Sequence, residues 1–231
     1  CINPRKFRIK KEIVMEVCGV GIPASIQNLL NVTGMTILNN FTSAYGADAV
    51  AAMGISYKIY MVPMQVSMGF SQGIMPLVSY NFASGDRKRM KASILFAIKL
   101  VVPALAVVTL LYYIGSGELI SLFMKNESII AYGSRFLRGF SLGLAFLSLD
   151  FLTVGVFQSL GFGKYALLFA VMRKLVLEIP ALLILNAIFP LYGLAYAQFT
   201  AELILGVCAI LMLRYIFRKY GNNIKTTTDP S

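Results

Sequence analysis

Apolar stretches of about 20 residues or more recur along this chain, and each is long enough to cross a bilayer as a helix. Of the 231 residues, 58% are hydrophobic and only 13% are charged, whereas a soluble domain carries about twice that share of charge. A backbone that crosses a bilayer must satisfy its own hydrogen bonds, which a helix does. We therefore expect an all-α integral membrane protein.

The positions of the apolar stretches and of the basic residues together predict a topology. We expect six transmembrane helices, at residues 13–41, 48–83, 89–114, 129–159, 165–188 and 192–219. Lys and Arg cluster before the first span, between the second and third spans and after the last, while the turns after the first, third and fifth spans are poor in them. Basic loops stay on the cytoplasmic side. The chain should thus comprise a basic cytoplasmic linker at 1–12, a six-helix lobe at 13–220 and a cytoplasmic tail at 221–231, with both ends inside the cell.

The net charge of +11 would suggest nucleic-acid binding in a soluble protein. Here the positive charges lie at helix ends, so the expected partner is the anionic inner leaflet of the cell membrane and not nucleic acid. The sequence contains no histidine, which excludes Ser-His-Asp and Cys-His catalysis and the usual zinc sites. Its three cysteines form no spaced motif. We expect neither an enzyme nor a protein with a bound cofactor.

Two seven-residue ladders run along the second expected span. A seven-residue step drifts by only about 20° on a helix, so the ladders lie side by side on one face. A polar ladder avoids lipid and points to protein or to a watery cavity, and methionines beside amides suit loosely specified ligands. The alternative is a simple helix–helix contact. The polar ladder comprises Lys58, Gln65, Gln72 and Ser79, and the methionine ladder comprises Met61, Met68 and Met75.

Other polar residues within the expected spans are candidates for the path of a substrate or cation. Gln27 and Asn31 stand one turn apart in the first span, where interhelical hydrogen bonding is the alternative role. Asp150 lies deep in the fourth span, and an acid there is costly unless it is paired or functional. It either binds a cation or proton, or forms a salt bridge with Lys or Arg of another helix.

Two further acids have possible partners one helical turn away. Glu178 stands four residues after Lys174 and close to Arg173, so an ion pair on one helix face competes with a role in transport. Glu202 stands four residues after Gln198, which predicts an amide–carboxylate pair in the last span. Both acids remain candidates for the transport path.

Several local motifs resemble the C-terminal half of multidrug and toxic compound extrusion (MATE) transporters. The run GIPA at residues 21–24, followed by Gln27 and by NVT at 31–33, is similar to that family's seventh helix. The run YGADAVAAMGI at 45–55 resembles its loop-to-helix signature. The runs GFSQGIMPLV at 69–78 and NFASGD at 81–86 resemble the end of its following helix. The resemblance is strongest over residues 19–91.

This resemblance implies a transporter built of two six-helix lobes with a drug path between them. Export of cationic or amphipathic molecules would be driven by Na⁺ or H⁺, and the N-terminal lobe would be a partner missing from this chain. An even number of spans with both ends inside also lets two such lobes sit in the same orientation. One departure concerns coupling: Asn31 stands where the sodium-coupled branch typically has a glutamate, whose partner acid aligns near Asp150.

Three alternatives to an active drug exporter remain open, one of which is that the chain is an incomplete gene product with no activity alone. A related lipid-linked oligosaccharide flippase would hold an anionic headgroup, yet the candidate cavity residues are amides, methionines and acids, with Lys58 and Lys99 as exceptions. A membrane assembly subunit without transport activity would show seams of small residues rather than polar ladders.

Overall fold

The computed structural model describes residues 11–221, apart from some side chains near both ends of that range and those of Pro23, Ala24, Gln27 and Asn31. The basic segment before residue 11 and the tail after residue 221, both expected to be cytoplasmic, lie outside the described residues. Every regular element within residues 11–221 is helical. The elements are α1 (Lys11–Ser43), α2 (Ala47–Ala83), α3 (Arg87–Ile114), α4 (Ser116–Ser121), α5 (Glu127–Leu142), α6 (Leu144–Ser159), α7 (Gly163–Val171), the π-helical segment η2 (Met172–Glu178), α8 (Ile179–Ile188) and α9 (Gly193–Gly221).

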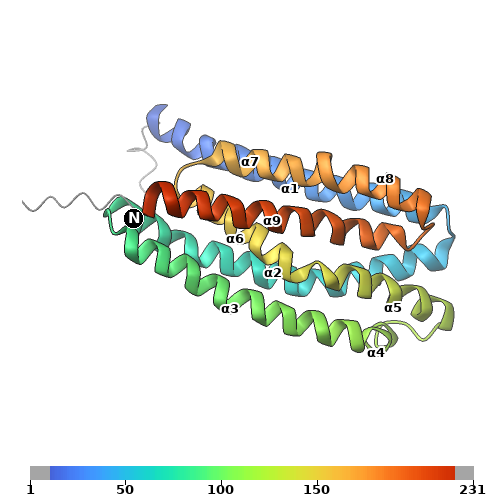
Figure 1. Ribbon diagram of the computed structural model, residues 1–231. Coiled ribbons are helices and arrows are strands. Elements are labelled where there is room, and N and C mark those ends of the chain that lie inside the picture. The colour runs from blue at the N-terminus through green and yellow to red at the C-terminus, as the bar shows by residue number, and fades with distance from the viewer. Residues whose placement is uncertain (1–10, 222–231) are drawn as a thin grey trace, which may run out of the picture.

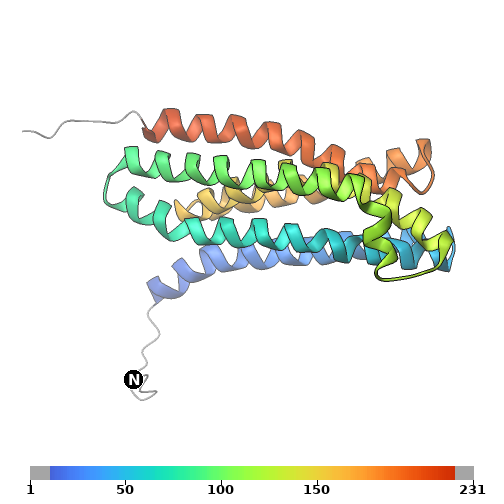
Figure 2. The same cartoon turned by 90° about the horizontal axis from the view of Figure 1, so that it is seen from below.

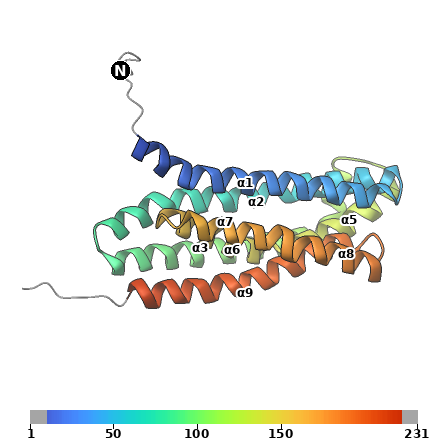
Figure 3. The same cartoon turned by 90° about the horizontal axis from the view of Figure 1, so that it is seen from above.

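The helices run side by side as one elongated bundle (Figure 1). Helices α7 and α8 lie between α1 and α9 (Figure 3), and α3 runs beside α2 on the opposite side of the bundle (Figure 2). The start of α1, the turns after α2 and α6, and the end of α9 all lie at one end of the bundle. This is the arrangement that six passes with both ends on one side require.

Two of the six expected spans are composite. Helices α5 and α6 meet at a bend of 45° around Gly143, and α7 continues through η2 into α8. Among the described residues, Arg87–Ile114 and Gly193–Arg218 are each long and apolar enough to cross a membrane alone, and α5 with α6 forms a third such span if the bent pair is counted as one. Helix α2, which contains amides, hydroxyls and glycines, is not among these candidate spans.

Glycines with positive φ make the two tight turns at the end of the bundle where α1 starts and α9 ends. Gly85 has a φ of 78° and Gly161 a φ of 76°, a backbone region that glycine enters at little cost. After Gly85, the Asp86 side chain caps α3 by accepting a hydrogen bond of 2.9 Å from the backbone N–H of Arg89. The sequence SGD therefore ends α2 and starts α3 within three residues.

The bundle interior contains two main groups of buried apolar side chains. The first core lies toward α4 and includes Met53, Tyr60, Phe136, Phe140, Leu147 and Leu194. The second core lies toward the turns after α2 and α6 and includes Val78, Met90, Ile94, Val154, Leu205 and Ala209. Polar groups that lie between these two cores are removed from water. A functional site built from buried polar groups would therefore lie at that level of the bundle.

Candidate functional site

All of the buried charged side chains among the described residues gather between the two cores. We call this set the buried charge cluster, and it consists of Asp150, Arg173, Lys174, Glu178 and Glu202. Along α6, Asp150 falls between Leu147 of the first core and Val154 of the second. Along α9, Glu202 likewise falls between Ala197 and Leu205. Charges at this depth are costly unless they are paired.

Arg173 is the centre of the cluster. Its Nη1 lies 3.1 Å from Oδ2 of Asp150, and its Nη2 lies 2.6 Å from Oε1 of Glu202. The guanidinium carbon also lies 5.4 Å from the centre of the Phe151 ring, within cation–π range. A guanidinium presents several donors in one plane, so it can hold two carboxylates at once. This one side chain thereby joins η2 to both α6 and α9.

The second ion pair of the cluster lies against α1. Nζ of Lys174 lies 2.6 Å from Oε1 of Glu178, which confirms the pair that the four-residue spacing predicted. Gly34 of α1 faces this pair: a Cβ atom added there would lie 2.8 Å from Lys174 Nζ and 3.3 Å from Glu178 Oε1. Any side chain at this position would displace the Lys174 ammonium from its place beside Glu178.

The π-helical segment explains how these residues are positioned. The N–H of Ile179 donates to the carbonyl of Lys174, five residues earlier, which is the wider turn of a π-helix. Pro180 follows at once and has no N–H to continue the ladder. Such segments are rare and often occur at functional sites. Here the segment holds both cations and Glu178 on consecutive turns.

The cluster contains three carboxylates and only two cations. In addition, Asp150 Oδ1, Glu178 Oε2 and Glu202 Oε2 are buried and have no hydrogen-bond partner among the described residues. The same holds for Nε of Arg173. Buried polar atoms normally have partners, so these oxygens are available to a proton or a small cation. Within residues 11–221, no three His, Cys, Asp or Glu side chains converge as a ready-made metal site, because the two cations separate the acids.

Glu202 and Gln198 do not form the pair that their spacing suggested. Nε2 of Gln198 instead donates a 2.8 Å hydrogen bond to the hydroxyl of the buried Tyr60 on α2. Glu202 turns to Arg173 because a charged partner gives a stronger hydrogen bond than a neutral amide. The expected pair was wrong, yet both side chains are buried and bonded across helices.

Four other predicted site residues, Gln65, Met68, Gln72 and Met75, lie on α2 and are not members of the buried charge cluster. Gln65 and Gln72 are exposed along α2, as is Lys58 of the same ladder. Met68 and Met75 are half-buried beside them. Ser79 differs, because its hydroxyl donates a 2.7 Å hydrogen bond to the carbonyl of Ser159. The side chains of Gln27 and Asn31 lie outside the described residues.

Arg173 and Lys174 have a larger role than the sequence suggested. The sequence indicates them only as possible partners of nearby acids, whereas in the structure they hold the cluster together. The available signal was the presence of two adjacent cations inside an apolar stretch, where a charge implies a partner.

Comparisons with known proteins agree with the resemblance seen in the motifs. The MatE family model matches residues 23–184. The multidrug export protein MepA of Staphylococcus saprophyticus is 34% identical over 212 residues, which cover 91% of this chain and 46% of that relative. MepA of Staphylococcus aureus strain bovine RF122 is 31% identical over 219 residues, 94% of this chain and 48% of the relative.

Solved structures support the fold. The crystal structure of MATE in complex with MaL6 has a TM-score of 0.88 at 20% identity, over 96% of this chain and 51% of that one. The chain thus spans about half the length of the curated relatives and of this solved transporter.

Proposed function

This chain belongs to the MatE family, and we propose that it forms one six-helix lobe of a secondary active exporter of cationic or amphipathic molecules, driven by proton or Na⁺ antiport. It is an all-α multi-pass membrane protein whose relatives are named multidrug export proteins. Those relatives are longer than this chain, and their additional length is enough for a second six-helix lobe. The start of α1 and the end of α9 lie at the same end of the bundle, which supports two lobes in the same orientation.

The observation that carries the coupling part of this proposal is the charge imbalance of the buried cluster. Three buried carboxylates against two cations leave one negative charge to be balanced. An uncompensated charge in this environment is strongly unfavourable, so binding of one proton or monovalent cation stabilises the cluster. If the lobe changes shape when that ion leaves, ion binding and drug binding become linked reciprocally.

Asp150 is the acid that we assign to the coupling ion. Its pair with Arg173 is 3.1 Å long, against 2.6 Å for the pair of Glu202 with the same guanidinium. The longer pair is the easier one to exchange for a proton or a cation. Because Arg173 is bound to Asp150 and Glu202 on different helices, release of one pair would loosen α6 from η2 while α9 stays attached.

The drug-binding face that we propose is the exposed polar strip of α2. Gln65 and Gln72 offer amide oxygens to cations, and Met68 and Met75 beside them offer deformable apolar surface. Such a surface accommodates many ligand shapes. Gln27 and Asn31 of α1 belong to this proposed face on sequence grounds alone.

The test is Asp150→Asn in a full-length transporter that contains this lobe, reconstituted in vesicles under an imposed proton or sodium gradient. The substitution leaves two carboxylates and two cations, so the protein should still fold. Ion-driven efflux should fall at least about tenfold, equivalent to roughly 1.4 kcal/mol, while drug binding without a gradient stays nearly unchanged.

Asp48→Asn is the matched control, because Asp48 is exposed at the start of α2 and its carboxylate only accepts a hydrogen bond from Ser128. Applying each gradient separately identifies the coupling ion. Normal export by Asp150→Asn under both gradients would place coupling elsewhere, with the missing lobe as the next place to search.

A further inference from the structure

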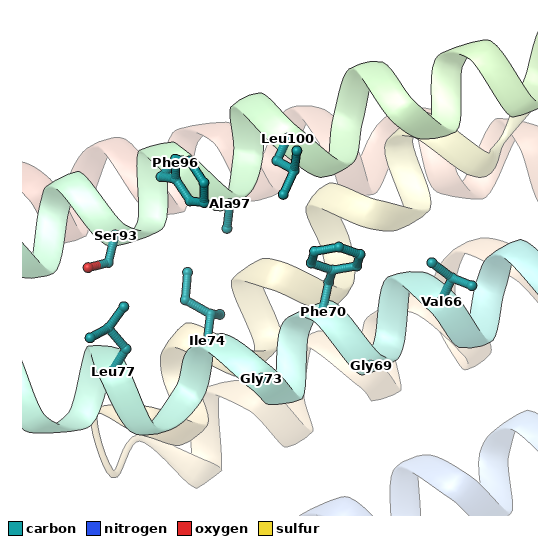
Figure 4. Close-up of a pocket in the computed structure, with 10 residues that line it drawn as sticks. All are labelled: Val66, Gly69, Phe70, Gly73, Ile74, Leu77, Ser93, Phe96, Ala97 and Leu100. Carbon is teal, nitrogen blue, oxygen red and sulfur yellow. The ribbon is translucent and has the colours of Figure 1, made fainter.

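An apolar groove runs between α2 and α3 (Figure 4), and neither Gln65 nor Gln72 of the polar strip lines it. Its volume is about 570 Å³, within the range of small-molecule sites. Phe70 and Leu77 of α2 and Phe96 and Leu100 of α3 form its walls, and Ser93 is its single hydroxyl-bearing residue. Because adjacent residues on a helix differ by about 100° in direction, Gln72 and Gly73 face different surroundings.

Two glycines one turn apart form the floor of the groove on α2. A Cβ atom added at Gly69 or at Gly73 would meet nothing within 4 Å. Neither glycine is therefore needed for close packing against another helix of this chain. Their effect is to leave the groove open, so that an elongated apolar group can lie against the backbone of α2.

The cationic residues along α3 indicate which kind of ligand fits the groove. Arg89 stands one turn before Ser93 and two turns before Phe96, and its side chain is 81% exposed. Lys99 stands one turn after Phe96, is exposed, and has no ion-pair partner among the described residues. Ten residues, a rise of about 15 Å along α3, separate Arg89 from Lys99, so the two cations cannot contact one phosphate, and Arg89 is the one that stands at the level of the α2–α3 turn.

The α2–α3 turn is strongly basic. It carries four cations, Arg87, Lys88, Arg89 and Lys91, against the single acid Asp86, which lies 3.5 Å from Arg89. A ligand that combines an acyl chain with a negative headgroup matches both the apolar groove and this positive end.

We propose that this groove binds an anionic phospholipid of the leaflet at the α2–α3 turn. One acyl chain lies over Gly69 and Gly73, and the phosphate lies at the level of Arg89. The rival occupant is a transmembrane helix from the missing lobe or from a second copy, because glycines four residues apart also suit helix packing. A helix would not need Arg89.

The test uses the chain reconstituted in vesicles containing phosphatidylglycerol or phosphatidylcholine with a photoreactive group on the acyl chain. Adducts mapped by mass spectrometry should fall on α2 and α3 residues of the groove, and phosphatidylglycerol should label more strongly. Arg89→Gln should lower phosphatidylglycerol labelling about fivefold, the effect of roughly 1 kcal/mol per basic residue, and leave phosphatidylcholine labelling unchanged. Lys99→Gln, about 15 Å from Arg89 along α3, should change neither.

Two controls separate the headgroup from the acyl-chain site. Gly73→Leu should abolish labelling by both lipids, because the side chain fills the groove, whereas Lys164→Gln, beside the other turn at that end of the bundle, should change neither. Equal labelling by the two lipids, or labelling that Arg89→Gln does not alter, would overturn the anionic site. Labelling that persists in Gly73→Leu, or disulfide formation between copies carrying Gly73→Cys, would overturn the lipid assignment. None of these measurements depends on transport.

Discussion

Polar groups have opposite environments in the buried charge cluster and on the exposed polar strip of α2. In the cluster, Arg173 and Lys174 form ion pairs with acids of the same lobe, and the whole set is shielded from solvent. On the strip, Gln65 and Gln72 are neutral and exposed. Buried charged groups must find partners within the fold, whereas exposed neutral amides remain without a protein partner at lower cost. The difference fits the proposal that ions bind inside the lobe and drugs bind on its surface.

The largest effect should come from breaking the centre of the cluster. Arg173→Gln leaves Asp150 and Glu202 buried without their cation, and loss of one partner of a buried pair costs about 3–5 kcal/mol. Thermal unfolding of the purified chain in detergent measures this loss. Arg214→Gln, at an exposed position on α9, is the matched control and should change little. An Arg173→Gln variant as stable as the wild type would show that the ion pairs do not organise the lobe.

A triple substitution sharpens this result. Asp150→Asn and Glu202→Gln added to Arg173→Gln replace the charged triad by neutral groups of similar size. Removing all of the charges should restore part of the lost stability, because it removes the unpaired carboxylates. Recovery of roughly 1–3 kcal/mol over the single variant is expected in the same unfolding measurement. Further destabilisation would mean that shape and hydrogen bonding at this site matter more than charge.

The sequence predicted the secondary structure better than the contacts between helices. Apolar stretches and glycine turns gave the long helices, since both signals are local. The Lys174–Glu178 pair was also predictable because both residues lie on one helical face. The bend at Gly143 and the π-helical segment could not be read from the pattern, because each depends on what packs against it.

The cluster itself illustrates the same limit. Asp150, Arg173 and Glu202 lie on three separate elements, so only the packing of α6, η2 and α9 brings them together. The spacing of Gln198 and Glu202 predicted a local pair, and stronger partners on other helices overrode it. Sequence identified the acids as important, and the structure was needed to find what they pair with.

A smaller effect is expected where α1 contacts the cluster. Gly34→Ala places a methyl group 2.8 Å from Lys174 Nζ, which must move away from its position beside Glu178. The expected loss is about 1–2 kcal/mol, since a buried pair is strained rather than removed. Gly19→Ala is the control on the same helix, because nothing lies within 4 Å of its added Cβ, and it should stabilise by about 0.5–1 kcal/mol. Equal effects at the two positions would argue against close packing of α1 on the pair.

The smallest effect on stability, and the most selective effect on function, should come from the strip. Gln72→Leu removes an exposed amide, so the free energy of unfolding should change by less than about 0.5 kcal/mol. Gln198→Leu is the buried counterpart: it leaves the Tyr60 hydroxyl without its partner and should cost about 1–3 kcal/mol.

In a full-length transporter, Gln72→Leu should alter resistance to some compounds more than to others, because a deformable surface repacks around each ligand. Resistance profiles over several cationic drugs, read beside expression level, test this. A uniform loss for every compound together with lower expression would assign Gln72 to folding, and the contrast between the cluster and the strip would then fail.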